Sequence, residues 1–323
     1  MNRKTFDKFL GEKYMNHAER TPGKVLTKLS DLVELAIQSA RKKKLVLAVA
    51  QDEHSLEAVV AVANQGIVEA ILVGSAPKIR TIADRLKLDI SGMTIVEEEN
   101  DTQAVKLAVK LVHDHEGDIL MKGNVPTAIL LRGVLDKESG LRKSEVLSHF
   151  ALFEIPTYHK LLGLTDAAMV IAPDLKTKIA IINNAVDFMN RLGIKNPKVA
   201  ILGAVELVNE SMPATMDAAI IAKMNQRKQI SHCIIDGPLS YDIAISKESA
   251  LHKGIVSDVA GDADLLIVPD IEAGNLLYKA YGFSCNATLA ANVLGAAAPI
   301  VLTSRSDTEE AKQASIIMAA AVD

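Results

Sequence analysis

The chain has 323 residues, of which 49% are hydrophobic and 24% charged, as in an ordinary globular protein. Aromatic residues supply only 3% and the formal net charge is −4, which disfavours the stacking platforms and basic surface of a nucleic-acid-binding protein. No apolar run approaches the ~18 residues that span a bilayer, and the N-terminus lacks a signal-peptide apolar region. We therefore expect a cytoplasmic protein that binds neither nucleic acid nor membrane.

Residues 1–44 are basic, with eleven Lys and Arg against five Asp and Glu. They suit either a solvated helix face or an arm that binds a membrane surface or RNA. The two cysteines, Cys233 and Cys285, lie far apart without a CxxC partner. This spacing predicts neither a disulfide framework nor a zinc site, and we expect no bound metal.

Short apolar runs rich in β-branched residues recur along the chain and predict strands. They are LVLAVA (45–50), EAILVG (69–74), DILMKG (118–123), AAMVIA (167–172), KVAILG (198–203), HCIIDG (232–237), DLLIVP (264–269) and PIVLTS (299–304). Because the runs are continuously apolar, we expect them in a sheet that is covered on both faces.

Amphipathic stretches lie between these runs, with apolar residues at three- and four-residue steps. The predicted helices include residues 55–64, 102–115, 175–192 and 307–322. Strands that alternate with helices indicate an α/β fold with mainly parallel strands. The length suits two domains, and the polar segments 135–145 and 281–288 are the candidate boundaries.

The predicted strand at 299–304 ends at Ser304 and is followed by Arg305, just before the acids of residues 307–310. Two interpretations stay open. Ser306 and Glu309 match an S-x-x-E capping box, and the acids complement the helix dipole. Alternatively, Arg305 and the backbone N–H groups of the helix N-terminus bind an oxyanion or a phosphate.

The segment MKGNVPTAILLRGVL (121–135) has a similar arrangement. Lys122 leaves a strand, Gly123 permits a turn, and Thr127 and Arg132 lie on the next predicted helix. The chain contains neither G-x-x-x-x-G-K-[ST] nor a G-x-G-x-x-G after its first strand, so nucleotide-binding fingerprints are missing. Ligands of open α/β sheets bind at the carboxyl ends of strands, which makes this loop a candidate site.

Two further segments carry polar residues next to apolar runs. His149, in LSHFALFE after Ser148, is either a general base near a cleft or a buried structural histidine. In VAGDADLLIVPDIEAGNLLYK (259–279), Asn275 and Lys279 are four residues apart and share one helix face. This segment is either an ordinary turn and helix or a third polar loop facing a cleft.

Taken in order, MKGNVPTAILLRGVL, LSHFALFE, DGPLSYDIA, VAGDADLLIVPDIEAGNLLYK and SRSD resemble segments of the phosphate acetyltransferase and phosphate butyryltransferase family. The resemblance runs from about Leu45 to the end, and the butyryl branch is closer. It implies two three-layer α/β domains with mainly parallel sheets and an active-site cleft between them, as in isocitrate and isopropylmalate dehydrogenases. The first domain would comprise residues 1–141 plus 285–323, and the second residues 142–284.

The resemblance also implies the reaction, which is transfer of a short acyl group, butyryl or branched, between coenzyme A and inorganic phosphate. Both are substrates, no cofactor is permanently bound, and the enzyme would be a homodimer or a higher homo-oligomer. Alternatives are a phosphate acetyltransferase, a noncatalytic regulatory domain that binds acyl-CoA, and a decarboxylating dehydrogenase of similar architecture.

Residue roles follow from the matching motifs. Arg305 would hold phosphate, Ser304 would donate to the oxyanion, and Asp307 would be the base. The acetyl branch has an aspartate base seven residues after the serine, where this chain has Ala311. The substrate-binding residues would be Lys122, Gly123, Thr127, Arg132, Ser148, His149, Asp236, Asn275 and Lys279.

Overall fold

The computed structural model describes residues 26–39, 41–303 and 307–322. Their strands form one eleven-stranded sheet in the order β3-β2-β1-β4-β11-β10-β5-β6-β9-β7-β8. The strands are β1 Lys43–Ala48, β2 Val68–Gly74, β3 Thr94–Glu97, β4 Ile119–Lys122, β5 Ser148–Glu154, β6 Leu162–Thr165, β7 Lys198–Leu202, β8 Ile234–Leu239, β9 Leu265–Ile267, β10 Thr288–Leu294 and β11 Ile300–Val301.

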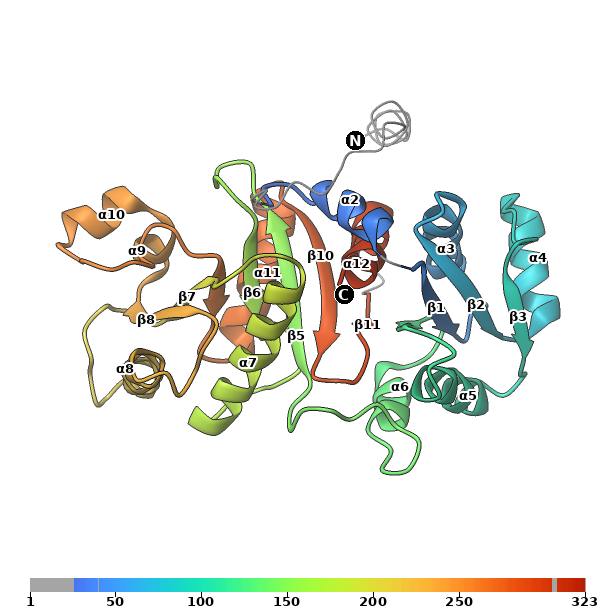
Figure 1. The fold of residues 1–323 in the computed structure, drawn as a ribbon, viewed down its shortest axis with the longest axis horizontal. Helices are drawn as coiled ribbons and strands as arrows, with labels where there is room; N and C mark the ends of the chain where they lie inside the picture. The colour runs from blue at the N-terminus through green and yellow to red at the C-terminus, as the bar shows by residue number, and fades with distance from the viewer. Residues whose placement is uncertain (1–25, 40, 304–306, 323) are drawn as a thin grey trace.

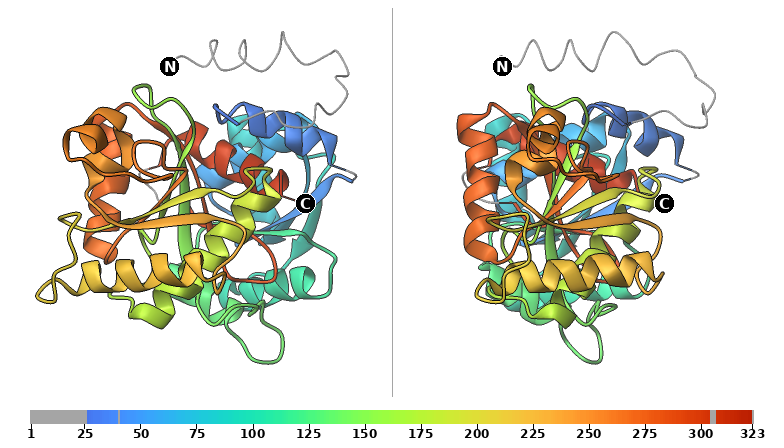
Figure 2. Two further views of the ribbon diagram at one scale, coloured as in Figure 1. Left: turned by 60° about the vertical axis from the view of Figure 1, so that its left-hand side comes forward. Right: turned by 90° about the vertical axis from the view of Figure 1, so that its left-hand side faces the viewer.

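Helices lie on both sides of these strands (Figures 1 and 2). They are α2 Asp31–Gln38, α3 Glu53–Asn64, α4 Ala76–Leu86, α5 Asp101–His113, α6 Thr127–Val134, α7 Leu175–Arg191, α8 Pro213–Gln226, α9 Tyr241–Ile245, α10 Lys247–His252, α11 Ile271–Ser284 and α12 Glu309–Ala320. The predicted α/β class is confirmed, and so are the helices predicted at 55–64, 102–115, 175–192 and 307–322. Among the described helices, none has the length and apolarity to cross a membrane.

Most neighbouring strands are parallel, as predicted, because helices connect them. The exceptions are in the middle, where β10 is antiparallel to both β11 and β5, and β5 is antiparallel to β6. One sheet therefore joins a half built on β1–β4 and β11 to a half built on β5–β10. The domain division at 141, 142, 284 and 285 stays a prediction.

Apolar side chains fill the space on both faces of the sheet. Leu45, Leu47, Leu152 and Ile182 belong to a buried cluster that also takes in α2, α3 and α12. On the opposite face, one cluster lies under α5 and α6 and another under α9 and α11. Continuous apolar strands thus bury both faces, as their sequence pattern predicts.

The predicted strand at 167–172 is wrong, because these residues form a loop after β6. The buried carboxylate of Asp166 accepts hydrogen bonds from the backbone N–H groups of Ala168 (2.8 Å) and Met169 (2.9 Å), and this turn ends the strand. Ile171 is 69% exposed, so the apolar run does not mark a buried strand. Periodicity alone does not separate such a run from a short strand.

Candidate active site

Two parallel strands end beside each other at one edge of the sheet. β11 pairs with β4 through Ile300 with Leu120 and Val301 with Met121. The chain therefore leaves the sheet at Lys122 and at Thr303 on the same side, the carboxyl ends of the strands, where ligands of α/β proteins bind. Ser304 and Arg305 follow Thr303 and lie outside the described residues, so the structure does not test them.

A small pocket of about 40 Å³ lies at this edge. Its lining residues are Asp52, His54, Ser55, Lys122, Gly123, Asn124, Val125, Thr303 and Lys312. They come from the N-terminus of α3, the turn after β4, the end of β11 and the first turn of α12. The pocket thus brings together segments that are far apart in the chain.

Two ammonium groups and one helix N-terminus give this pocket its chemistry. Lys122 Nζ donates to the carbonyl oxygens of Gly123 (3.2 Å) and Val125 (3.3 Å). Lys312, only 5% exposed, donates from Nζ to the carbonyl oxygen of Asp307 (2.8 Å). The N-terminus of α3 adds a partial positive charge, while its cap Asp52 contributes one carboxylate. The two ammonium groups and the N-terminus of α3 together suit the binding of an oxoanion.

Gly123 is required for the turn that presents Lys122. A Cβ atom there would lie 2.2 Å from the carbonyl oxygen of Val49 and 2.7 Å from that of Ala48. Without it, the Gly123 N–H donates to Ala48 (2.9 Å) and the Asn124 N–H to Val49 (2.9 Å). The turn thus packs directly on the end of β1, an approach that only glycine allows.

The N-cap of α12 differs from the predicted capping box. Thr308 is the cap residue, and its Oγ1 accepts from the Ala311 N–H (3.2 Å). Ser306 lies outside the described residues. Asp307, which precedes the cap, carries a carboxylate that disfavours a negative charge on Tyr278 of α11. Burial and this carboxylate together raise the pKa of Tyr278 far above its usual range, so the phenol stays protonated.

Ser148 and His149 do not face the same site, because neighbouring residues of a strand point to opposite faces. Ser148 Oγ accepts from Asn184 Nδ2 on α7 (3.2 Å). The His149 ring lies edge-on to Tyr278 on α11, with centroids 5.5 Å apart. Of this predicted pair, His149 therefore lies against α11, whereas Ser148 lies against α7.

His149 is buried, and its Nδ1 has no hydrogen-bond partner among the described residues. Burial lowers its pKa to about 4, so the imidazole is neutral at pH 7. In the unfolded chain, the His149 ring has its ordinary pKa of about 6.5 and takes up a proton below that pH. Its contribution to the stability of the folded protein is therefore present above pH 6.5 and is lost as the pH falls towards 4.

Between pH 7.5 and pH 5, the wild type should lose on the order of 2 kcal/mol of unfolding free energy through His149. The variant His149→Gln should not show this loss. Chemical denaturation at the two pH values would measure it. His252→Gln, at an exposed position of α10, is the matched control and should keep the wild-type loss. An unchanged pH dependence in His149→Gln would contradict the neutral buried ring.

The remaining predicted residues are spread over the sheet. Thr127 is the first residue of α6, and Arg132 is exposed in its last turn. Asn275 Nδ2 donates to the Ala167 carbonyl (3.2 Å), whereas Lys279 is exposed. Asp236 accepts from the next backbone N–H (2.8 Å) and lies on β8, the edge strand six positions from β11. Five strands separate β8 from β11, so Asp236 lies far from the pocket.

Lys312 lines the pocket but was not predicted as a site residue. A lysine in the first turn of a helix opposes the helix dipole, and that mismatch was the available signal for Lys312.

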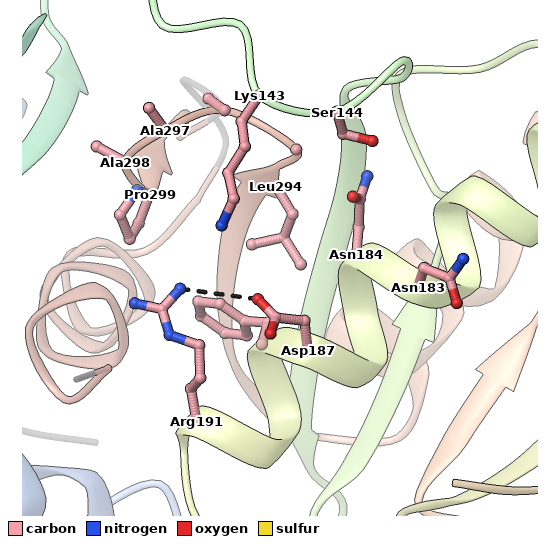
Figure 3. A pocket seen from close by; sticks show the side chains of 13 residues that line it. Lys143, Ser144, Asn183, Asn184, Asp187, Arg191, Leu294, Ala297, Ala298 and Pro299 are labelled. Atoms are coloured by element: carbon pink, nitrogen blue, oxygen red, sulfur yellow. Dashed lines mark ion pairs between the residues drawn. The ribbon is translucent and has the colours of Figure 1, made fainter. Parts of the chain in front are cut away.

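A second, larger pocket of about 330 Å³ lies beside α7 and the loop between β10 and β11 (Figure 3). Lys143, Asn184 and Arg191 border it, and Arg191 forms an ion pair with Asp187 (3.8 Å). Pro299 lines this pocket and Thr303 the first one, so the two pockets lie at opposite ends of β11. Among the described residues, no group of three His, Cys, Asp or Glu side chains could hold a metal ion.

The molecule is an α/β protein with a basic pocket at the carboxyl ends of parallel strands, where ligands of this fold class bind. Residues 29–106 and 101–320 match the model of the phosphate acetyl/butaryl transferase family. A phosphate butyryltransferase from Clostridium acetobutylicum is 46% identical over 288 residues, which cover 89% of this chain and 96% of that protein. The chain belongs to the phosphate acetyltransferase and butyryltransferase family.

Solved structures agree with this assignment. A branched-chain phosphotransacylase from Enterococcus faecalis V583 superimposes with a TM-score of 0.76 and 32% identity, over 86% of this chain and 97% of that one. A 4-hydroxythreonine-4-phosphate dehydrogenase from Klebsiella pneumoniae superimposes with a TM-score of 0.56 and 12% identity, over 86% and 98%. The second likeness concerns the fold alone, and it bears out the predicted dehydrogenase-like architecture.

Proposed function

We propose that this enzyme transfers a short acyl group between coenzyme A and inorganic phosphate, with butyryl-CoA or a branched short acyl-CoA as the donor. The observation that carries the proposal is the pair of ammonium groups, Lys122 and Lys312, beside the end of the strand that leads to Ser304 and Arg305. Acetyl-CoA is the alternative donor, since the family includes both activities. Because coenzyme A thioesters are the donors, the cytoplasm is the expected compartment.

The reaction breaks the carbon–sulfur bond of the thioester and forms a carbon–oxygen bond to phosphate. It passes through a tetrahedral oxyanion, and the proton of the phosphate hydroxyl ends on the coenzyme A sulfur. In the reverse direction the thiol must lose its proton, because the thiolate is the nucleophile. The site must therefore hold phosphate, stabilise an oxyanion and move one proton.

We assign these tasks to the residues around the end of β11. Arg305 holds phosphate with two parallel hydrogen bonds, and Lys122 and Lys312 balance its charge. Ser304 donates to the oxyanion, and Asp307 accepts the proton of the phosphate hydroxyl and delivers it to sulfur. Gly123 shapes the turn that presents Lys122.

Thr127, Arg132, Asn275 and Lys279 would contact the anionic groups of coenzyme A. The neutral His149 ring would border the acyl group. Ser148 and Asp236 are less favoured as substrate contacts, because one bonds to α7 and the other lies at the far edge of the sheet.

A thiol-release assay tests the function. We expect free thiol from butyryl-CoA only when phosphate is also present, together with a stoichiometric acyl phosphate. Comparing acetyl-, butyryl-, isobutyryl- and isovaleryl-CoA would identify the preferred donor. Thiol release without phosphate would indicate a hydrolase, and binding of acyl-CoA without turnover would indicate a regulatory domain.

We further propose that two copies associate through α8. Met216 and Ile220 are spaced by four residues and therefore share one face of α8, on which they are 39% and 42% exposed, and the cap residue Met212 is 38% exposed. Leu207 and Val208, in the preceding loop, are 72% and 56% exposed. An exposed apolar stripe of this kind is typical of a protein–protein interface.

We expect the double variant Met216→Glu/Ile220→Glu to sediment as a monomer, whereas the wild type sediments as a dimer or a higher oligomer. Buried glutamates facing each other across a two-fold axis would repel and lose their hydration. Leu251→Glu, at an exposed apolar position of α10, is the matched control and should leave the assembly intact. An unchanged sedimentation coefficient in the double variant would rule out α8 as the interface.

A further inference from the structure

Strand β11 is short, and most of the neighbouring edge of β10 has no strand beside it. In the described part of the chain, β11 consists of Ile300 and Val301 and pairs with β10 between Ile300 and Val293 alone. β10, by contrast, pairs with β5 along all of Thr288–Leu294. Because a buried backbone N–H group needs a hydrogen-bond acceptor, the uncovered part of β10 requires partners from outside the sheet.

Helix α12 supplies these partners through Ser315. Ser315 Oγ accepts from the Ala291 N–H (2.9 Å) and donates to the Ala311 carbonyl oxygen one turn earlier (2.6 Å). The next residue of β10, Asn292, donates from Nδ2 to the Ser315 carbonyl oxygen (3.2 Å). Both Ser315 and Asn292 are buried, so water does not compete for these bonds. Two adjacent residues of β10 thus hold one residue of α12, which sets the position of the helix along the strand.

α12 also carries Lys312 into the pocket beside Lys122. Lys312 precedes Ser315 by three residues, so the two lie next to each other on the helix surface. Lys312 lines the pocket together with Lys122 and Thr303. Because less than one helical turn separates Lys312 from Ser315, any shift of α12 at Ser315 also displaces the ammonium group.

The position of Lys312 is unfavourable for α12 unless the helix is restrained. An ammonium group in the first turn opposes the helix dipole, and this one is buried. In the absence of a bound anion, a small movement of α12 towards solvent would relieve both effects. The hydrogen bonds between Ser315 and β10 oppose this movement, since breaking them would leave the buried Ala291 N–H without an acceptor.

We propose that Ser315 is a positioning residue, which joins α12 to β10 and thereby places the Lys312 ammonium where it binds phosphate. The inference rests on the proposed acyl transfer, and it adds a residue that does not line the pocket. Helix packing alone does not require the hydroxyl, because alanine is the better helix former and α12 already contains several alanines.

The test compares Ser315→Ala, Lys312→Met and the double variant in the phosphate-dependent assay. We expect Ser315→Ala to raise the KM for phosphate roughly tenfold, with kcat and the KM for acyl-CoA changed less than about twofold. If the serine acts through Lys312, it has no effect on phosphate once Lys312 is methionine. The double variant should then have the KM for phosphate of Lys312→Met alone.

Ser315→Cys provides a graded variant. A thiol has nearly the size of the hydroxyl and is a weak acceptor, so it keeps part of the contact with the Ala291 N–H. Its KM for phosphate should therefore lie between those of the wild type and Ser315→Ala.

Thr215→Val is the matched control. Thr215 is buried at the start of α8, where its Oγ1 accepts from the Asn209 N–H (2.9 Å) and donates to the Met212 carbonyl oxygen (2.8 Å). Removing this hydroxyl breaks two hydrogen bonds of the same kind far from the pocket. Thermal unfolding should show a comparable loss of stability in Thr215→Val and Ser315→Ala, whereas only Ser315→Ala should have a raised KM for phosphate.

The outcomes separate the positioning role from the function. A normal KM for phosphate in Ser315→Ala, or increases that multiply in the double variant, would overturn the positioning role while leaving acyl transfer intact. An equal increase in Thr215→Val would also overturn it, because general destabilisation would then explain the effect. A wild-type enzyme that released thiol without phosphate would refute the proposed function itself.

Discussion

Replacing Arg305 by alanine is expected to lower kcat/KM for phosphate-dependent thiol release by about a thousandfold. A guanidinium binds phosphate through two parallel charge-assisted hydrogen bonds, each worth about 1.5–3 kcal/mol, so losing both costs on the order of a thousandfold. The loss should appear in both kcat and the KM for phosphate, measured by initial rates at varied phosphate. The melting temperature should stay within a few degrees of the wild type.

Two further variants sharpen this test. Arg305→Lys keeps the charge but loses the planar fork, so we expect it to recover only part of the activity. Arg80→Ala removes an exposed arginine on α4 and should leave the rates unchanged. A folded Arg305→Ala enzyme with near-normal rates would exclude Arg305 from the reaction.

Replacing Lys312 by methionine is expected to raise the KM for phosphate by roughly 30-fold, with a smaller effect on kcat. Methionine is unbranched and apolar, so it removes the ammonium and little packing. Lys312 is only 5% exposed, and the buried charge is costly unless an anion or a polar group balances it. The ammonium also donates to the Asp307 carbonyl oxygen (2.8 Å), and the variant loses this bond, so we expect the melting temperature of the ligand-free variant to stay within a few degrees of the wild type.

Initial rates at varied phosphate, with acyl-CoA saturating, measure this effect. Lys106→Met, at an exposed position of α5, is the control and should keep the wild-type KM for phosphate. If Lys312→Met bound phosphate normally, the pocket beside Lys122 would not be the phosphate site.

The fold was largely predictable because buried parallel strands leave a strong apolar pattern. The antiparallel centre of the sheet was not, since β5 and β10 were not recognised as strands. β5 begins with the polar residues Ser148 and His149, which interrupt the continuous apolar pattern expected of a buried strand. Conversely, the apolar run at 167–172 has the sequence pattern of a strand, but its first residues form a turn, because their N–H groups donate to the Asp166 carboxylate.

The site was predictable only in part. The motifs indicated Lys122 and the end of β11, but strand order alone placed these two segments side by side. Lys312 joins Lys122 in the pocket from a distant helix, so no local pattern predicts that the two lie together. The opposite directions of Ser148 and His149 would have followed from strand alternation, had β5 been recognised.

The place of β11 between β4 and β10 has a consequence for biosynthesis. β4 ends at Lys122, but the strand that covers its edge begins at Ile300. At ribosomal speeds of 5–20 residues per second, the nascent chain exposes that edge for on the order of 10 s or more. An unprotected parallel edge invites intermolecular pairing, so premature termination before β10 should yield aggregates instead of a shortened but functional product.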